Sequence, residues 1–196
     1  SGTDCNDTNP LLTDNCAGGS VVNLTMFIQG YYMGGNTMNS VKFNQDFVSN
    51  MDEVEEITVE LHDATTYDVV DTATGLLHTD GALSVTFNTA AAGDYFISVR
   101  GSNMVEIWSA TAQTIGSTPL SYDFSADGAA YTDGSQASVV EVESGVFAAY
   151  SGDNNHDTVV DLSDYADVST DRARANAAGA QLPPQVDTGS TPPLPP

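Results

Sequence analysis

Short segments in which apolar and polar residues alternate decide what this chain can fold into. Between residues 22 and 29, apolar side chains alternate with Asn, Thr, Phe and Gln, and similar alternation returns further along the chain. Side chains on a strand point to opposite faces in turn, so each such segment predicts a half-buried strand. The apolar positions of the four clearest segments are Val22, Leu24, Met26 and Ile28; Ile57, Val59 and Leu61; Leu83, Val85 and Phe87; and Tyr95, Ile97 and Val99.

Weaker strand patterns complete the series. They lie at 67–70, 105–107, 120–124, 139–142 and 146–150, and Gly, Asp and Asn separate the segments. Strands that recur at intervals of about 10 to 15 residues are typical of a sandwich. We therefore expect a mainly β chain, with an antiparallel, immunoglobulin-like β-sandwich over residues 21–151. Within it we expect 31–39 to be a loop and the acidic run 52–56 to be a solvated loop before a strand.

Charge excludes several classes of partner. The chain has 27 acidic and 4 basic residues, and its formal net charge is −23. With so few cations, binding to nucleic acid or to an anionic membrane surface is not expected. The sequence contains no apolar stretch of about 20 residues, so membrane insertion is not predicted. So strong a negative charge repels itself in a compact state, and divalent cations are natural counterions.

Two cysteines mark an N-terminal arm over residues 1–20. In an oxidising compartment, Cys5 and Cys16 would close a short loop worth roughly 3 kcal/mol; the alternative is a pair of reduced thiols. The composition, poor in Lys and rich in Thr, Ser, Asn and Gly, is typical of secreted proteins. The polar start at Ser1 fits a leader already removed. We expect an extracellular or cell-surface location.

Residues 153–164 have the spacing of a calcium loop of 12 residues. Oxygen-bearing side chains fall at loop positions 1, 3, 5, 9 and 12, and position 7 would offer its backbone carbonyl. Calcium takes six to eight oxygen ligands, which this pattern can supply. The predicted Ca²⁺ ligands are Asp153, Asn155, Asp157, Val159, Asp161 and Asp164. The alternative is a solvated acidic loop without an ion.

The segment 151–165, Ser-Gly-Asp-Asn-Asn-His-Asp-Thr-Val-Val-Asp-Leu-Ser-Asp-Tyr, resembles the first half of a dockerin repeat. Dockerins are calcium-binding modules of secreted bacterial proteins. The resemblance implies the same calcium ligands, an apolar position at Val160, and helix packing that begins at Leu162. The strands at 57–64 and 95–103 more loosely resemble the sandwich domains that precede such repeats.

Two departures from the dockerin pattern change the expected role of the loop. Position 6 is Thr158 instead of the usual Gly, although the turn there needs a positive φ. Only one loop is present, followed by a predicted helix over 163–178, so binding of a partner through paired helices does not carry over. We expect a module over 152–180 that attaches its helix to the sandwich. A tail over 181–196 follows it, rich in proline and extended.

The N-terminal run 4–10 resembles the acidic, Cys-containing calcium repeats of secreted bacterial surface proteins. It would offer oxygens from Asp4, Asn6, Asp7 and Asn9 for a second ion. Asx turns in an arm tied by a disulfide are an equally good interpretation. The sequence leaves both open.

Catalytic patterns are weak throughout the chain. The three histidines, His62, His78 and His156, have no metal-ligand spacing, and no nucleophile elbow is found. We therefore expect a non-enzymatic structural protein, stabilised by calcium, that self-assembles into an extracellular fibre or surface layer through its N-terminal arm or C-terminal tail. The alternative is a carbohydrate-binding or adhesion module with polysaccharide as its partner, in which Trp108, Tyr31, Tyr32 and Tyr67 would form a stacking platform.

Overall fold

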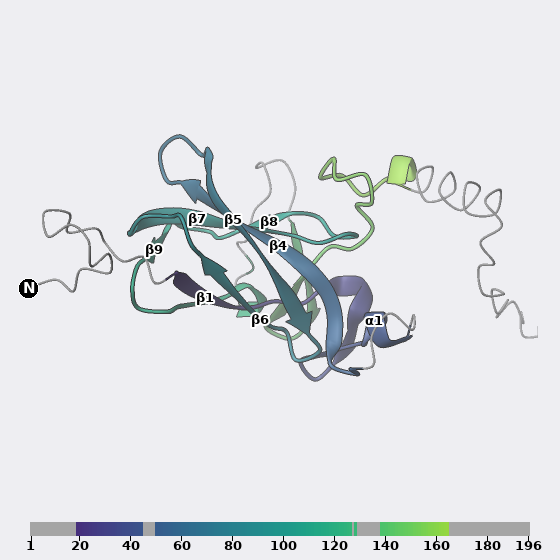
Figure 1. Ribbon diagram of the computed structural model, residues 1–196. Coiled ribbons are helices and arrows are strands. Elements are labelled where there is room, and N and C mark those ends of the chain that lie inside the picture. The colour runs from purple at the N-terminus through teal and green to yellow at the C-terminus, as the bar shows by residue number, and fades with distance from the viewer. Residues whose placement is uncertain (1–18, 45–49, 127, 129–137, 165–196) are drawn as a thin grey trace, which may run out of the picture.

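Strands dominate the computed structural model, which describes residues 19–44, 50–126, 128 and 138–164 (Figure 1). The strands of the two larger sheets are β1 (Ser20–Thr25), β4 (Glu53–Asp63), β5 (Val69–His78), β6 (Ala82–Phe87), β7 (Gly93–Arg100), β8 (Ile107–Trp108), β9 (Gln113–Ile115) and β10 (Leu120–Asp123). The remaining described elements are β2 (Tyr32–Gly34), β3 (Thr37–Met38), β11 (Val139–Glu143), β12 (Val146–Ala149), the helical turn α1 (Val41–Asn44), and the 3-10 turns η1 (Gln29–Tyr31) and η2 (Phe124–Ala126).

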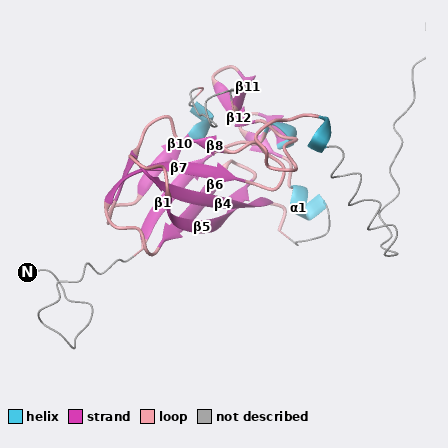
Figure 2. Cartoon of the chain, turned by 90° about the horizontal axis from the view of Figure 1, so that it is seen from above, coloured by secondary structure: helices cyan, strands magenta, loops and turns pink. Residues whose placement is uncertain are grey.

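The two larger sheets have the strand orders β10–β1–β6 and β5–β4–β7–β8, and β9 also pairs with β7. Every ladder between described strands is antiparallel except that of β1 with β10, which is parallel. The expectation of a wholly antiparallel sandwich is therefore wrong at this edge. Parallel neighbours need a long crossover connection, and here the connection runs through the whole second sheet before the chain returns beside β1 (Figure 2).

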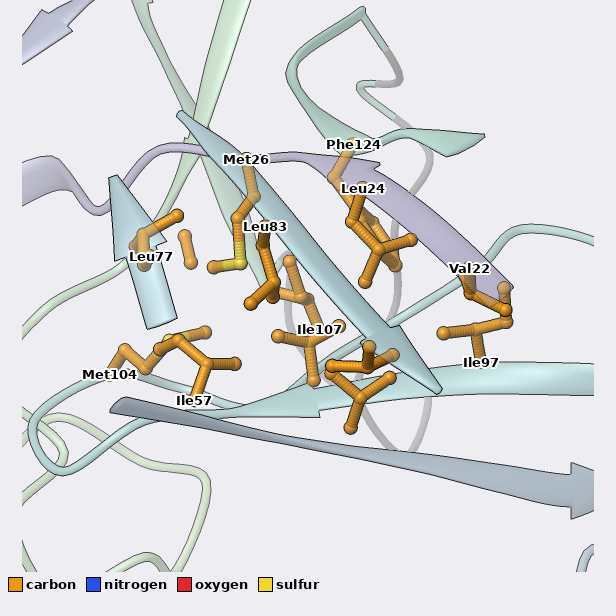
Figure 3. Packing of buried hydrophobic residues seen from close by; sticks show 14 of the residues in the cluster. Val22, Leu24, Met26, Ile57, Leu77, Leu83, Ile97, Met104, Ile107 and Phe124 are labelled. Atoms are coloured by element: carbon orange, nitrogen blue, oxygen red, sulfur yellow. The ribbon is translucent and has the colours of Figure 1, made fainter. Parts of the chain in front are cut away.

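One hydrophobic core joins the two sheets. Figure 3 shows Val22, Leu24 and Leu83 of one sheet lying above Ile57 and Ile97 of the other. All the apolar positions of the four alternating segments are buried, so the strand faces predicted from the sequence are confirmed. At about 25 cal/mol for each Å² of apolar surface removed from water, this burial is the main favourable term in folding.

Phe27 departs from the alternation. It occupies an outward position in the predicted strand, but it is 2% exposed. Strand β1 ends at Thr25, and the next residues turn under the β11–β12 hairpin, where the amide of Ala149 donates to the carbonyl of Phe27 at 2.8 Å. Tertiary contact with a hairpin more than 100 residues later overrides the local period of two.

Two expected loops contain strands instead. Strands β2 and β3 form a small hairpin inside 31–39, with a turn at Gly35 and Asn36, both of which have positive φ. Strand β4 begins at Glu53, so most of the acidic run 52–56 lies in the sheet. Pairing with a long β5 extends β4 this far, since Glu53 lies opposite His78.

Candidate metal centre

The 153–164 loop begins where the chain leaves β12, and hydrogen bonds fasten it to the turn after β7. The carbonyl of Tyr150 accepts from the amide of Val105 at 2.8 Å. The amide of Gly152 donates to the backbone and side-chain oxygens of Asn103, at 3.2 and 3.1 Å. Glycine is required here, because φ is +117° and an added Cβ would lie 2.8 Å from Cγ1 of Val160.

Asp153, at loop position 1, is 1% exposed and organises the first half of the loop. Its Oδ1 accepts from the amide of Asp157 at 3.1 Å, and its Oδ2 accepts from the amide of Thr158 at 3.0 Å. The chain folds back far enough for these bonds through left-handed conformations at His156 (φ +59°) and Thr158 (φ +70°). The positive φ expected at position 6 is therefore present, although a β-branched residue occupies it.

Asp164, at position 12, closes the loop from its other end. Its Oδ1 accepts from the amides of Asn154 at 2.8 Å and Asn155 at 3.2 Å, and its Oδ2 accepts from the amide of Asp161 at 2.9 Å. The carboxylate is 5% exposed. The first and last predicted ligands are thus both buried, and each is held by backbone amides of the loop.

The remaining predicted ligands lie nearer to the surface. Oδ1 of Asn155 accepts from the amide of Asp157 at 2.9 Å, and its amide nitrogen donates to Oδ2 of Asp157 at 3.0 Å. Oδ1 of Asp157 accepts from the amide of Val159, and Oδ1 of Asp161 accepts from the amide and hydroxyl of Ser163. All six predicted residues therefore belong to one hydrogen-bonded loop.

The pKa values of the two buried carboxylates are shifted in opposite directions. Burial, with the nearby negative charge of Asp164, raises the pKa of Asp153 above its usual value, and hydrogen bonds from the amides of Thr158 and Asp157 oppose the shift only in part. The amide of Asp161, with those of Asn155 and Asn154, lowers the pKa of Asp164. A cation between two such carboxylates would favour ionisation of both.

Within the part of the chain that the structure describes, the side chains are not gathered around a metal position. Among the described residues, no three or more His, Cys, Asp or Glu side chains gather into a cluster that could hold an ion. The loop carboxylates turn toward backbone amides instead. The donors are carboxylate, amide and carbonyl oxygens, which suit calcium and not zinc, whose usual ligands are thiolate and imidazole. The calcium site therefore stays a prediction.

The two apolar positions of the dockerin resemblance have different surroundings. Val160 is 49% exposed, but one of its methyl groups packs on the backbone of Gly152. Leu162, expected to begin the packing of the helix, is 85% exposed to solvent. A helical turn starts at 162–164. The rest of the predicted helix, the tail over 181–196, the Cys5–Cys16 pair and the possible ligands Asp4, Asn6, Asp7 and Asn9 lie outside the described residues.

Sequence reasoning missed one buried carboxylate. Glu55, predicted to be solvated, is 8% exposed; its Oε1 accepts from the amide of Ser102, and its Oε2 has no hydrogen-bond partner among the described residues. Val54 and Ile57 anchor this part of β4 in the core, so the strand carries Glu55 inward. Glu55 continues the inward series of Ile57, Val59 and Leu61, so extending that alternation two residues toward the N-terminus would have predicted its burial.

A surface hollow of about 400 Å³ lies on the outer side of the β10–β1–β6 sheet. Asp123 is the one carboxylate of its lining, which otherwise mixes polar and apolar residues: Asn23, Leu24, Thr25, Ala82, Leu83, Ser84, Ser121 and Tyr122 of that sheet, and Leu76 and His78 of β5. Nδ1 of His78 lies 2.9 Å from Oδ2 of Asp52, which is not one of the residues that line the hollow. The pair of carboxylates expected of a glycosidase is not found among the lining residues.

Comparison with known proteins finds no matching family model, no similar curated protein and no similar solved structure. The resemblance to a dockerin half-repeat therefore depends on the loop residues alone. Among the described helices, none has the length and apolar character needed to cross a membrane.

Proposed function

We propose that this chain is a non-enzymatic structural protein of the cell exterior or cell surface, stabilised by calcium bound in the 153–164 loop. The observation that carries the proposal is the burial of Asp153 and Asp164 at opposite ends of that loop. Burial disfavours the charged form of Asp153, and the chain has a net charge of −23, so a cation in the loop would offset an unfavourable concentration of negative charge.

The same six residues would hold the ion: side-chain oxygens of Asp153, Asn155, Asp157, Asp161 and Asp164, and the carbonyl of Val159. Calcium there would neutralise the loop and fix its fold. Because Gly152 is tied to Asn103, an ordered loop would in turn hold the end of β12 against the turn after β7. The role is that of a clamp, in a loop resembling half a dockerin repeat.

The proposal also includes a specific arrangement of the sandwich and of the segments on either side of it. We assign the described sheets to an immunoglobulin-like sandwich, preceded by an N-terminal arm tied by a disulfide between Cys5 and Cys16. The EF-hand-like loop, one short helix and a tail rich in proline follow it. The support is the packing of two sheets on one core and the position of the loop directly after the last strand.

Self-assembly is the partner class that the sheet edges favour. Strand β5 pairs only with β4 among the described strands, and Val69 and Val70 on it are 53% and 41% exposed. An apolar, unpaired edge is a template for another strand. The N-terminal arm or the C-terminal tail of a second copy would add to such an edge by strand addition.

Sedimentation velocity of the full chain tests the assembly. In millimolar calcium, rising protein concentration should produce dimers and longer species, and chelation should reduce them. A chain that stays monomeric at high concentration in calcium contradicts the assembly. The calcium clamp is tested separately by its effect on unfolding.

A further inference from the structure

The outer face of the β5–β4–β7–β8 sheet carries a row of aromatic rings. Tyr67, in the turn between β4 and β5, stacks beside Phe96 of β7, with ring centroids 5.6 Å apart and planes at 28°. Phe96 lies 6.4 Å from Trp108 of β8. Their neighbours along the strands, Ile97 and Ile107, are buried in the core, so the rings occupy the opposite face.

Contacts beneath the row hold the rings in place. Trp108 packs on the ring of His62 at 4.0 Å, and its Nε1 donates to Oε1 of Glu106 at 2.5 Å. His62 is itself buried; its Nδ1 donates to the carbonyl of Tyr67, and its Nε2 lies 3.0 Å from the hydroxyl of Ser98. Rings fixed in this way lose little conformational freedom when they meet a ligand.

Tyr67 has an unfavourable backbone conformation that burial of its side chain does not explain. Its φ is +62°, and the residue is 58% exposed. A left-handed conformation is unfavourable for a bulky residue and easy for Asn or Gly. Since so little of Tyr67 is buried, core packing does not explain why a tyrosine stands here. Backbone strain of this kind gathers at binding and catalytic sites.

The charges on this face are already paired with one another. Nη2 of Arg100 donates to Oε1 of Glu60 at 3.1 Å, and Nη1 lies 3.9 Å from Oε2 of Glu106. An anionic ligand would find no free cation among these groups. Stacking this face on the same face of a second copy would bring the Glu60 and Glu106 carboxylates of both chains together, with only one arginine on each side. A neutral ligand meets neither obstacle.

We propose that the face built around Tyr67, Phe96 and Trp108 binds a neutral polysaccharide. The apolar C–H face of a pyranose ring packs on aromatic rings, whose faces carry partial negative charge. Sugar hydroxyls can donate to the carboxylates of Glu60 and Glu106 at the edge of the row. Tyr31 and Tyr32, the other aromatic residues expected in such a platform, pack against the core and take no part. The site is separate from the calcium loop and does not depend on it.

Affinity electrophoresis of the full chain tests the proposal, with gels that contain galactomannan, xyloglucan or mixed-linkage glucan, and with pull-down on cellulose and chitin. At least one of these should retain the chain. Trp108→Ala and Tyr67→Asn should each weaken that retention by about tenfold or more. Met33→Ala, a change at an exposed residue of β2, should leave it unchanged.

The Tyr67→Asn variant separates binding from folding. Asn accepts the left-handed backbone, so its melting temperature should equal or exceed that of the wild type while binding falls. Retention of the wild type on none of the polysaccharides, or equal retention of wild type and both variants, overturns the proposal. So does loss of self-association in Trp108→Ala, measured by sedimentation, because that result assigns the face to a second copy of the chain.

Discussion

The backbone amide of Thr158 donates a hydrogen bond of 3.0 Å to Oδ2 of Asp153, and it does so from a left-handed conformation with φ of +70°. The bond joins loop position 6 to position 1 and brings the buried carboxylate under the turn. A β-branched side chain is poorly suited to this backbone. The loop therefore keeps its fold at a cost in conformational energy at one residue.

Replacing that residue should stabilise the protein. Thr158→Gly removes left-handed strain of roughly 1–2 kcal/mol, and the greater freedom of Gly in the unfolded chain offsets about 0.5–1 kcal/mol of the gain. We expect a net increase of about 1 kcal/mol in the free energy of unfolding, measured by urea denaturation in chelator. Thr158→Ala, which keeps a Cβ in the strained conformation, is the control and should gain less. A lower stability for the glycine variant would contradict this account of the turn.

Leu61 tests the core between the sheets. It is fully buried on β4, so Leu61→Ala should cost about 2–5 kcal/mol from lost burial and the cavity left behind. Val69→Ala, on the exposed edge of β5, should change the free energy of unfolding by less than about 0.5 kcal/mol. Equal effects of the two changes would mean that these sheets do not enclose the core as described.

Gly75 tests the close approach of β5 to β6, which belong to different sheets. A Cβ at this position would lie 2.6 Å from Cδ1 of Leu83 and 2.7 Å from Cγ1 of Val85. Both neighbours are buried, so Gly75→Ala forces them to repack and should lower stability by about 1–3 kcal/mol. Thermal unfolding measures this loss. An unchanged melting temperature would show that the strands lie further apart.

Asp63 makes the turn before Tyr67 sensitive to pH. The amides of Thr66 and Thr65 donate to its Oδ1 and lower its pKa below the usual 3.8. Because the folded pKa is the lower one, the stability it contributes is complete above 3.8 and is lost as pH falls through the folded pKa. The free energy of unfolding of the wild type should therefore exceed that of Asp63→Asn at about pH 6, and the two values should converge in strong acid. Denaturation of both proteins at several pH values measures this. A difference that persists unchanged at low pH would remove the charge from the explanation.

Local patterns in the sequence predicted the central strands correctly. Alternation at Ile57, Val59 and Leu61, for example, gave both the strand and its buried face. The edges of the fold were less predictable. The parallel pairing of β1 with β10 and the burial of Phe27 depend on segments about 100 residues away, which no local period reports.

The two candidate sites differ in the same way. Loop spacing predicts Asp153 and Asp164 as ligands from the sequence alone, and the structure shows that both are buried at the ends of the loop; their binding of an ion stays a prediction. The aromatic row could be predicted only in part. The sequence suggests Trp108 and Tyr67 as members of a stacking platform, but Phe96 links them only because β7 lies between β4 and β8. Strand order, which the alternation pattern does not encode, makes that contact.

The most direct measurement is the thermal unfolding of the full chain in millimolar calcium and in chelator. Ion binding to the folded state adds RT ln(1 + [L]/Kd), about 2.7 kcal/mol at a hundredfold excess over Kd, so calcium should raise the melting temperature by several degrees. Asp153→Asn and Asp164→Asn should abolish that rise, and Glu56→Gln, a matched loss of charge at an exposed position, should preserve it. Identical wild-type curves in calcium and chelator would contradict the calcium clamp.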